Sequence, residues 1–218
     1  MINIIYEDNH LLIVEKPQNM PAQGDSSRDR DLLTELKGYI KEKYNKPGEV
    51  YLGLVHRLDR PSGGLMAFAR TSKAAARLSA QLKSRQMSRT YRAVVKGYLD
   101  NEGRMEDWLL KDEKTNISRV VREGTPGAKF AALTYKTVAR AGGWSLVEVH
   151  LETGRSHQIR VQFSHAGHPL YCDNKYDVGA SRGNLALWAY KLTLQHPTKK
   201  EDMTFTCPPP KTEPWDWF

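Results

Sequence analysis

This sequence of 218 residues has little cysteine and no long apolar run. Its two cysteines, Cys172 and Cys207, are too few for a disulfide framework and lack the spacing of a zinc ribbon. No stretch approaches the roughly 18 apolar residues of a membrane span. Residues 1–14 lack the cationic start and the long apolar run of a secretory signal. We therefore expect a reduced, cytoplasmic protein with no membrane partner.

Several motifs of cofactor-dependent and hydrolytic enzymes are also absent. The chain has no phosphate-binding P-loop, no Gly-x-Gly-x-x-Gly after a strand and no Gly-x-Ser-x-Gly elbow. Five residues suggest a metal site by type alone, namely His150, His157, His165, His168 and Asp173. Their spacing argues against a metal, because no His-Glu-x-x-His pair is present. We expect no metal, no nucleotide cofactor and no other cofactor.

Acidic residues are missing from the whole segment between Asp59 and Asp100, which holds nine basic residues. The chain carries a net charge of +8, so the rest of it sums to 8 − 9 = −1. Localised positive charge suits a polyanion, because neutralised phosphates release counterions. Charge alone leaves RNA, DNA and anionic lipid open, and a solvated helix face without acids is the plainer alternative.

Apolar periodicity predicts both strands and helices. Strands are expected at residues 4–6, 11–14, 51–55, 65–69, 91–99, 131–139, 144–151 and 185–194, and helices at 32–44 and 156–164. A further helix, capped by Thr71 or Ser72, would turn Ala75, Leu78 and Leu82 inward and Lys73, Arg77 and Lys83 outward. No repeat or clear linker is present, which favours one α+β domain over residues 1–218.

Two charged segments are candidates for chemistry. Asp59 lies between Arg57 and Arg60 in a loop joining two expected strands, and nearby guanidinium groups favour an ionised carboxylate that could act as nucleophile or base. The alternative is an aspartate that only ties its loop through salt bridges. Arg160, near the start of the helix expected at residues 156–164, could pair bidentately with a carboxylate or a phosphate. The alternative is that Arg155 and Arg160 are surface arginines.

Three segments stand in a characteristic order: His-Arg-Leu-Asp-Arg at 56–60, Arg-Thr-Tyr-Arg-Ala-Val-Val-Lys-Gly at 89–97, and Thr-Gly-Arg-Ser-His-Gln-Ile-Arg-Val at 153–161. In order and spacing they resemble the signature motifs of the RluA-type pseudouridine synthases. Supporting matches are Glu7-Asp8, Lys16-Pro17, Gly-His-Pro-Leu at 167–170, Asp173, Tyr176 and His196-Pro197. The resemblance covers residues 4–210.

The resemblance implies a mixed, largely antiparallel central sheet flanked by helices, with an RNA-binding cleft. It implies a cofactor-free isomerase that converts uridine to pseudouridine in ribosomal or transfer RNA. Asp59 would be the catalytic aspartate, by attack on the anomeric carbon or by a glycal route; Arg160 would pair with it, and Tyr91 would stack on the base. The expected substrate-binding residues are Arg57, Arg60, Arg155 and His157.

Four positions depart from the family pattern: Gly63, Gln162, Cys172 and Trp188. They favour the alternative of a non-catalytic RNA-binding module or RNA-folding helper, whereas the intact trio of Asp59, Tyr91 and Arg160 favours the enzyme. We expect no S4-type RNA-binding domain, since only residues 1–4 precede the first motif. We also expect a monomer whose C-terminal aromatic residues pack on the core.

Overall fold

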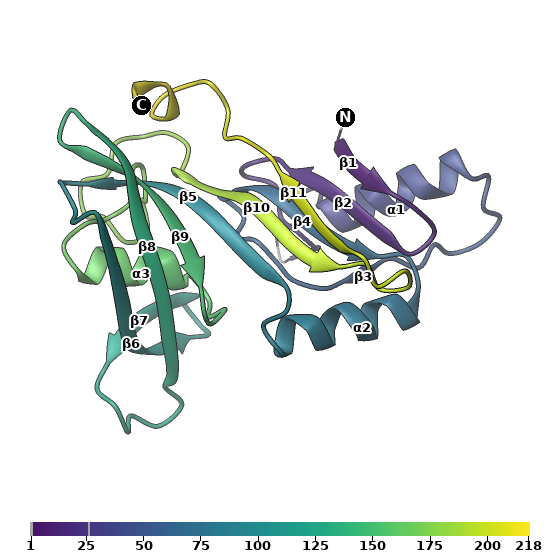
Figure 1. Cartoon of the computed structure of the whole chain (residues 1–218), viewed down its shortest axis with the longest axis horizontal. Coiled ribbons are helices and arrows are strands. Elements are labelled where there is room, and N and C mark those ends of the chain that lie inside the picture. Colours follow the sequence, from purple (N-terminus) through teal and green to yellow (C-terminus); the bar gives the residue numbers. More distant parts are fainter. Residues whose placement is uncertain (1, 26) are drawn as a thin grey trace. The chain divides into compact units, whose positions relative to one another are not determined.

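The computed structural model describes residues 2–25 and 27–218; Met1 and Ser26, part of the expected domain, lie outside the described residues. The chain forms two compact units (Figure 1). Unit 1 consists of Met1–Arg89 with Ala189–Pro208, and unit 2 of Thr90–Trp188 with Pro209–Phe218. The single catalytic domain over residues 1–218 stays a prediction.

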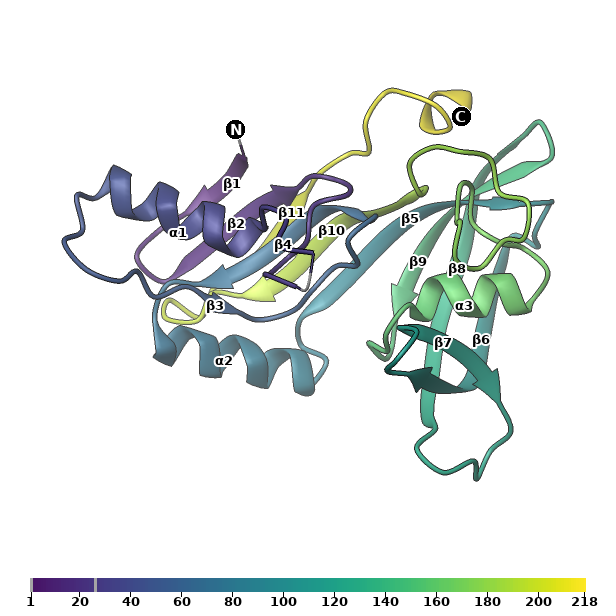
Figure 2. The same ribbon diagram turned by 180° about the vertical axis from the view of Figure 1, so that it is seen from behind.

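Unit 1 is a sheet with two helices. Its strands follow the order β1-β2-β4-β10-β11, with β3 beside β4. Their bounds are β1 Asn3–Glu7, β2 Leu11–Lys16, β3 Gly53–Leu54, β4 Gly63–Ala69, β10 Leu187–Gln195 and β11 Asp202–Thr206. The helices are α1 (Leu32–Lys43) and α2 (Ser72–Lys83), and Figure 2 shows α1 in front of β1 and β2. Strand β4 is buried along its whole length, so the core of this unit surrounds it.

Helix α2 displays the basic face that the sequence predicts. The Thr71 hydroxyl accepts a hydrogen bond from the Ala74 amide at 3.2 Å, which confirms the expected cap. Lys73, Arg77 and Lys83 are exposed. The expected inner face was partly wrong, because Ala75 and Leu82 are half-buried and the buried residues are Ala74, Leu78 and Gln81. Gln81 is tolerated inside because its amide makes two hydrogen bonds, at 2.8 and 2.9 Å, with the backbone of Gln195.

Unit 2 contains an antiparallel sheet in the order β5-β9-β8-β6-β7. Its strands are β5 Ser88–Lys96, β6 Glu102–Asp112, β7 Ile117–Val121, β8 Lys129–Ala141 and β9 Trp144–Leu151. Helix α3 (Gln158–His165) covers one face of β8 and β9, as the two opposite views show (Figures 1 and 2). The predominantly antiparallel pairing and the flanking helices agree with the expected α+β class.

The C-terminal aromatic residues contact the rest of unit 2, which confirms the expected packing in part, because Trp217 is still 37% exposed. The Trp217 ring lies 5.2 Å from the Tyr171 ring and 6.3 Å from the Trp144 ring between centroids. Trp215 is buried. Such offset and edge contacts stabilise aromatic pairs beyond the area that they bury. The tail therefore belongs to the packed part of this unit.

The turn between β1 and β2 is held by Asp8, and we expect it to make stability depend on acid pH. Burial raises the pKa of Asp8, but hydrogen bonds from the backbone of His10 and Leu11 and from Tyr6 and His196 outweigh it and lower the pKa to about 2. Because the folded-state pKa lies below the unfolded one, Asp8 stabilises the fold above about pH 4 and stops doing so as pH falls through about 2.

Asp8→Asn should therefore lower the free energy of unfolding by about 1 kcal/mol near neutral pH, a value reduced by the partial exposure of the carboxylate. The difference between the variant and the original protein should vanish near pH 2. Urea unfolding at several pH values measures it. A difference that stays constant down to pH 2 would show that Asp8 contributes only through geometry.

Candidate active site

Asp59 lies in the loop between β3 and β4, where the sequence placed it. The amide of Ser62 donates to the carbonyl oxygen of Asp59 at 3.0 Å, which closes a tight turn. Asp59 is half-buried, whereas Arg57 and Arg60 are exposed. Arg60 forms an ion pair with Asp29. The two residues that flank Asp59 in the motif, Arg57 and Arg60, thus carry exposed cationic side chains.

Lys16 holds the backbone of this turn, a role that the Lys16-Pro17 family match did not predict. Its fully buried ammonium donates to the carbonyl oxygens of Pro17 at 2.8 Å, Met20 at 2.7 Å and Arg60 at 3.0 Å. These three bonds use all three donors of an ammonium group. Burial lowers the pKa of Lys16 to about 7, and the Asp59 charge acts in the opposite direction. Lys16 therefore ties the end of β2 to the backbone that carries Asp59.

We expect Lys16→Met to damage both the fold and the site. Methionine fills similar space but leaves three carbonyl oxygens without their donor, which should lower the free energy of unfolding by about 2–4 kcal/mol. Thermal unfolding followed by circular dichroism measures this loss. Lys191→Met, at an exposed position of β10, is the matched control and should change stability by less than about 0.5 kcal/mol. Equal effects of the two substitutions would contradict the role of Lys16.

The two ends of the Asp59 loop are fixed by buried groups. His56 Nε2 accepts a hydrogen bond from the Ala67 amide at 3.1 Å. Burial, together with the positive charge of Arg89, lowers the pKa of His56 to about 3, so the imidazole is neutral. At the other end, Gly64 has φ +106°, and a Cβ there would lie 2.4 Å from the carbonyl oxygen of Ala189. Only glycine fits this close approach. Position 64 is thus a glycine that the backbone requires, although the neighbouring Gly63 departs from the family pattern.

In unit 2, Tyr91 lies on β5 opposite Val149 of β9 and is 5% exposed. Arg155 and His157 lie in the loop before α3, and Arg160 lies in its first turn. The expected helix start was wrong, because α3 begins at Gln158 and His157 has a left-handed φ of 55°. The Gln158 side chain accepts from the amide of Arg155 at 3.0 Å, which holds that residue in a turn outside the helix.

Arg160 makes a buried bidentate ion pair with Asp173. Its Nε donates to Asp173 Oδ2 at 2.9 Å and a terminal nitrogen donates to Oδ1 at 2.6 Å, with side chains 5% and 0% exposed. Asp173 also accepts from the amides of Lys175 and Tyr176 at 3.1 and 3.3 Å. This fork fixes the guanidinium plane. The expected pair between Arg160 and Asp59 stays a prediction.

Tyr176 completes the support around Arg160. The Arg160 guanidinium carbon lies 5.1 Å from the centroid of the Tyr176 ring, within the range of a cation–π contact. The Tyr176 hydroxyl accepts from the Ser118 amide at 2.9 Å and lies 2.7 Å from His157 Nδ1. Burial raises the pKa of Tyr176, so its hydroxyl keeps its proton. The sequence singled out Tyr176 as a family match and Asp173 as a family match and a candidate metal ligand; neither motif revealed their partners, which depend on the fold.

Three of the four histidines considered for a metal, His150, His157 and His168, lie within hydrogen-bond distance of other groups in the structure. His157 contacts Tyr176, and Asp173 is occupied by Arg160. Within residues 2–25 and 27–218, no cluster of three or more potential metal-ligating side chains is found. In the same residues, no helix has the length and apolar character needed to cross a membrane. The departure Gln162 is buried and donates to Asp107 at 2.7 Å, which gives it a structural partner.

Comparisons with known proteins identify the family. Residues 10–165 match the family model described as RNA pseudouridylate synthase. The chain is 34% identical to ribosomal large subunit pseudouridine synthase D of Neisseria meningitidis serogroup B, over 96% of this chain and 58% of that protein. It is 33% identical to tRNA pseudouridine synthase C of Pectobacterium carotovorum, over 94% of this chain and 58% of that protein.

A solved structure shows the same fold. Human RNA pseudouridylate synthase domain containing 4 superposes with a TM-score of 0.80 at 22% identity, over 96% of this chain and 89% of that one. This confirms the expected α+β fold of a pseudouridine synthase. The chain spans 58% of the length of several curated relatives that it matches. With its motifs, its fold and a family match over most of its length, the chain belongs to the RNA pseudouridylate synthase family.

Proposed function

We propose that this chain converts specific uridines of ribosomal or transfer RNA to pseudouridine, as a monomer in the cytoplasm and through one catalytic domain. The observation that carries the proposal is the family match over residues 10–165, which contains Asp59, Tyr91 and Arg160 together. Relatives named for the large ribosomal subunit and for tRNA support RNA as the substrate. The reaction rejoins the same uracil and ribose without net oxidation or reduction, and the proposal includes no cofactor.

In the proposed mechanism the N1–C1′ bond of uridine breaks, the uracil turns, and a C5–C1′ bond forms while C5 loses a proton and N1 gains one. Asp59 either attacks C1′ or assists a glycal route. Arg160 orients Asp59, and Tyr91 stacks on the base, which must leave its stack at a cost of a few kcal/mol. Arg57 fills the vacated space. The remaining contacts with the RNA backbone come from Arg60, Arg155, His157 and the basic face of α2.

The test is pseudouridine mapping on total RNA from cells that lack this protein, with and without the gene restored. We expect at least one site in ribosomal or transfer RNA to disappear on deletion and to return on restoration. If every site persists in the deletion strain, the enzymatic proposal fails. Altered RNA structure with all sites intact would instead favour a non-catalytic RNA-folding helper.

A further inference from the structure

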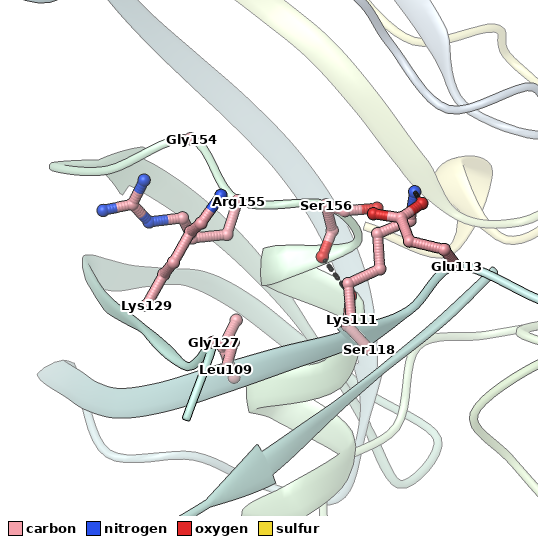
Figure 3. Close-up of a pocket in the computed structure, with 9 residues that line it drawn as sticks. All are labelled: Leu109, Lys111, Glu113, Ser118, Gly127, Lys129, Gly154, Arg155 and Ser156. Carbon is pink, nitrogen blue, oxygen red and sulfur yellow. Dashed lines mark hydrogen bonds and ion pairs between the residues drawn. The ribbon is translucent and has the colours of Figure 1, made fainter. Parts of the chain in front are cut away.

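A small basic hollow opens in unit 2 between β6, β7, the start of β8 and the loop before α3 (Figure 3). Its volume is about 220 Å³. Three cationic side chains line it, Lys111, Lys129 and Arg155, against the single carboxylate of Glu113. Three positive charges and one negative charge leave a net charge of +2 on its wall. The hollow therefore favours an anionic group.

The hollow has a fixed wall and two cationic groups available to a ligand. The Ser118 hydroxyl donates to the carbonyl oxygen of Ser156 at 2.9 Å, which joins β7 to the loop. Arg155 Nε donates to the carbonyl oxygen of Phe130 at 2.8 Å, which directs the guanidinium. Figure 3 shows Lys129 and Arg155 together next to Gly154. In the described part of the chain, neither Lys129 nor the terminal nitrogens of Arg155 form an ion pair.

Lys111 contributes less, because Glu113 lies 2.5 Å from its ammonium and neutralises it. The Lys111 side chain is one-third exposed, so this pair can open toward a stronger anion at small cost. The available charge is thus concentrated on Lys129 and Arg155. A guanidinium offers a planar fork that matches two phosphate oxygens, and an ammonium adds a point charge.

We propose that this hollow binds a phosphodiester group of the RNA, mainly through Lys129 and Arg155. This inference rests on the proposed function, because it assigns a backbone contact to the same substrate. RNA is favoured over a free anion because Arg155 lies five positions before Arg160 in the sequence, in the loop that Gln158 and Tyr176 hold in place. RNA bound in the hollow would therefore contact the same loop that leads into α3 and Arg160, a proposed catalytic residue.

The experiment measures binding of a fluorescein-labelled RNA hairpin with uridines in its loop, by fluorescence anisotropy over a series of salt concentrations. Lys129→Gln should weaken affinity about 3- to 10-fold and reduce the slope of log K against log salt by about 0.7 to 0.9. Lys111→Gln combined with Lys129→Gln should weaken affinity further. Lys136→Gln, at an exposed position of the same strand β8, is the matched control and should bind like the original protein. Circular dichroism verifies that every variant is folded.

Affinities and salt slopes of Lys129→Gln equal to those of Lys136→Gln would overturn the proposal. A site for a free anion would bind inorganic phosphate in a way that depends on Lys129 while the affinity for the hairpin does not, and this too would overturn the proposal. The two proposals fail separately. If RNA binding depends on salt and on Lys129 but no pseudouridine forms, only the enzymatic proposal fails. If pseudouridine forms but RNA affinity does not depend on Lys129, only the proposal that the hollow binds RNA fails.

Discussion

Replacing Asp59 by asparagine is expected to abolish pseudouridine formation and to leave the protein folded and able to bind RNA. Asparagine has nearly the same shape but carries no charge and is a poor nucleophile, so it serves neither the direct attack on C1′ nor the glycal route. Loss of a group at the reacting atoms should reduce the rate by a factor on the order of 10⁴ or more. Release of tritium from RNA labelled at uridine C5 measures the rate, because C5 loses its proton in the reaction.

Asp202→Asn is the matched control, since it removes an exposed carboxylate from β11 of the same unit and should leave the rate unchanged within a factor of two. RNA affinity should fall little in Asp59→Asn, because the cations of Arg57, Arg60 and α2 remain. A rate for Asp59→Asn close to that of Asp202→Asn would refute the catalytic assignment. Loss of RNA binding together with activity would instead show that Asp59 maintains the conformation of its loop.

Much of the fold could be predicted where apolar patterns are strong. Strand β9 matches the expected residues 144–151, and β4 and α2 were found near their expected places. Strands β6 and β7 were missed because β6 reads Glu-Gly-Arg-Met-Glu-Asp-Trp-Leu-Leu-Lys-Asp and alternates half-buried with exposed positions over its first part. Strand β6 is stabilised by its partners β7 and β8 on either side in the sheet, and its own sequence carries little apolar signal.

The proposed site divides in the same way. Motif order was enough to nominate Asp59, Tyr91 and Arg160, because each lies in a distinctive local sequence. The residues that hold these three side chains or their loops in place could not be predicted, because each contacts backbone or side-chain atoms that are distant in the sequence. Lys16 meets the carbonyl oxygen of Arg60 across 44 positions of sequence, and Arg160 meets Asp173 across 13. Burial of a charged side chain without a partner is prohibitively costly. The sequence therefore predicts a buried charge only when its partner is known.

The ion pair between Arg160 and Asp173 leads to the second large effect. Asp173→Asn keeps an oxygen that can accept from the amides of Lys175 and Tyr176 but removes the charge that faces Arg160. Breaking a buried pair from one side costs about 3–5 kcal/mol of unfolding free energy. Arg104→Gln is the matched contrast, because Arg104 makes an equally bidentate but half-exposed pair with Glu152, at 3.0 and 2.9 Å, and its loss should cost under about 1 kcal/mol.

Stability alone does not separate a folding role of Asp173 from a positioning role, so the rate must be measured where both variants are fully folded. If the fork with Asp173 aims Arg160 at the reacting groups, Asp173→Asn should lower the single-turnover rate at saturating RNA about 10- to 100-fold, because small displacements of a catalytic group are costly. Arg104→Gln should keep its rate. A rate unchanged in folded Asp173→Asn would mean that Arg160 needs no fixed orientation, and its proposed action on Asp59 would then lose its structural basis.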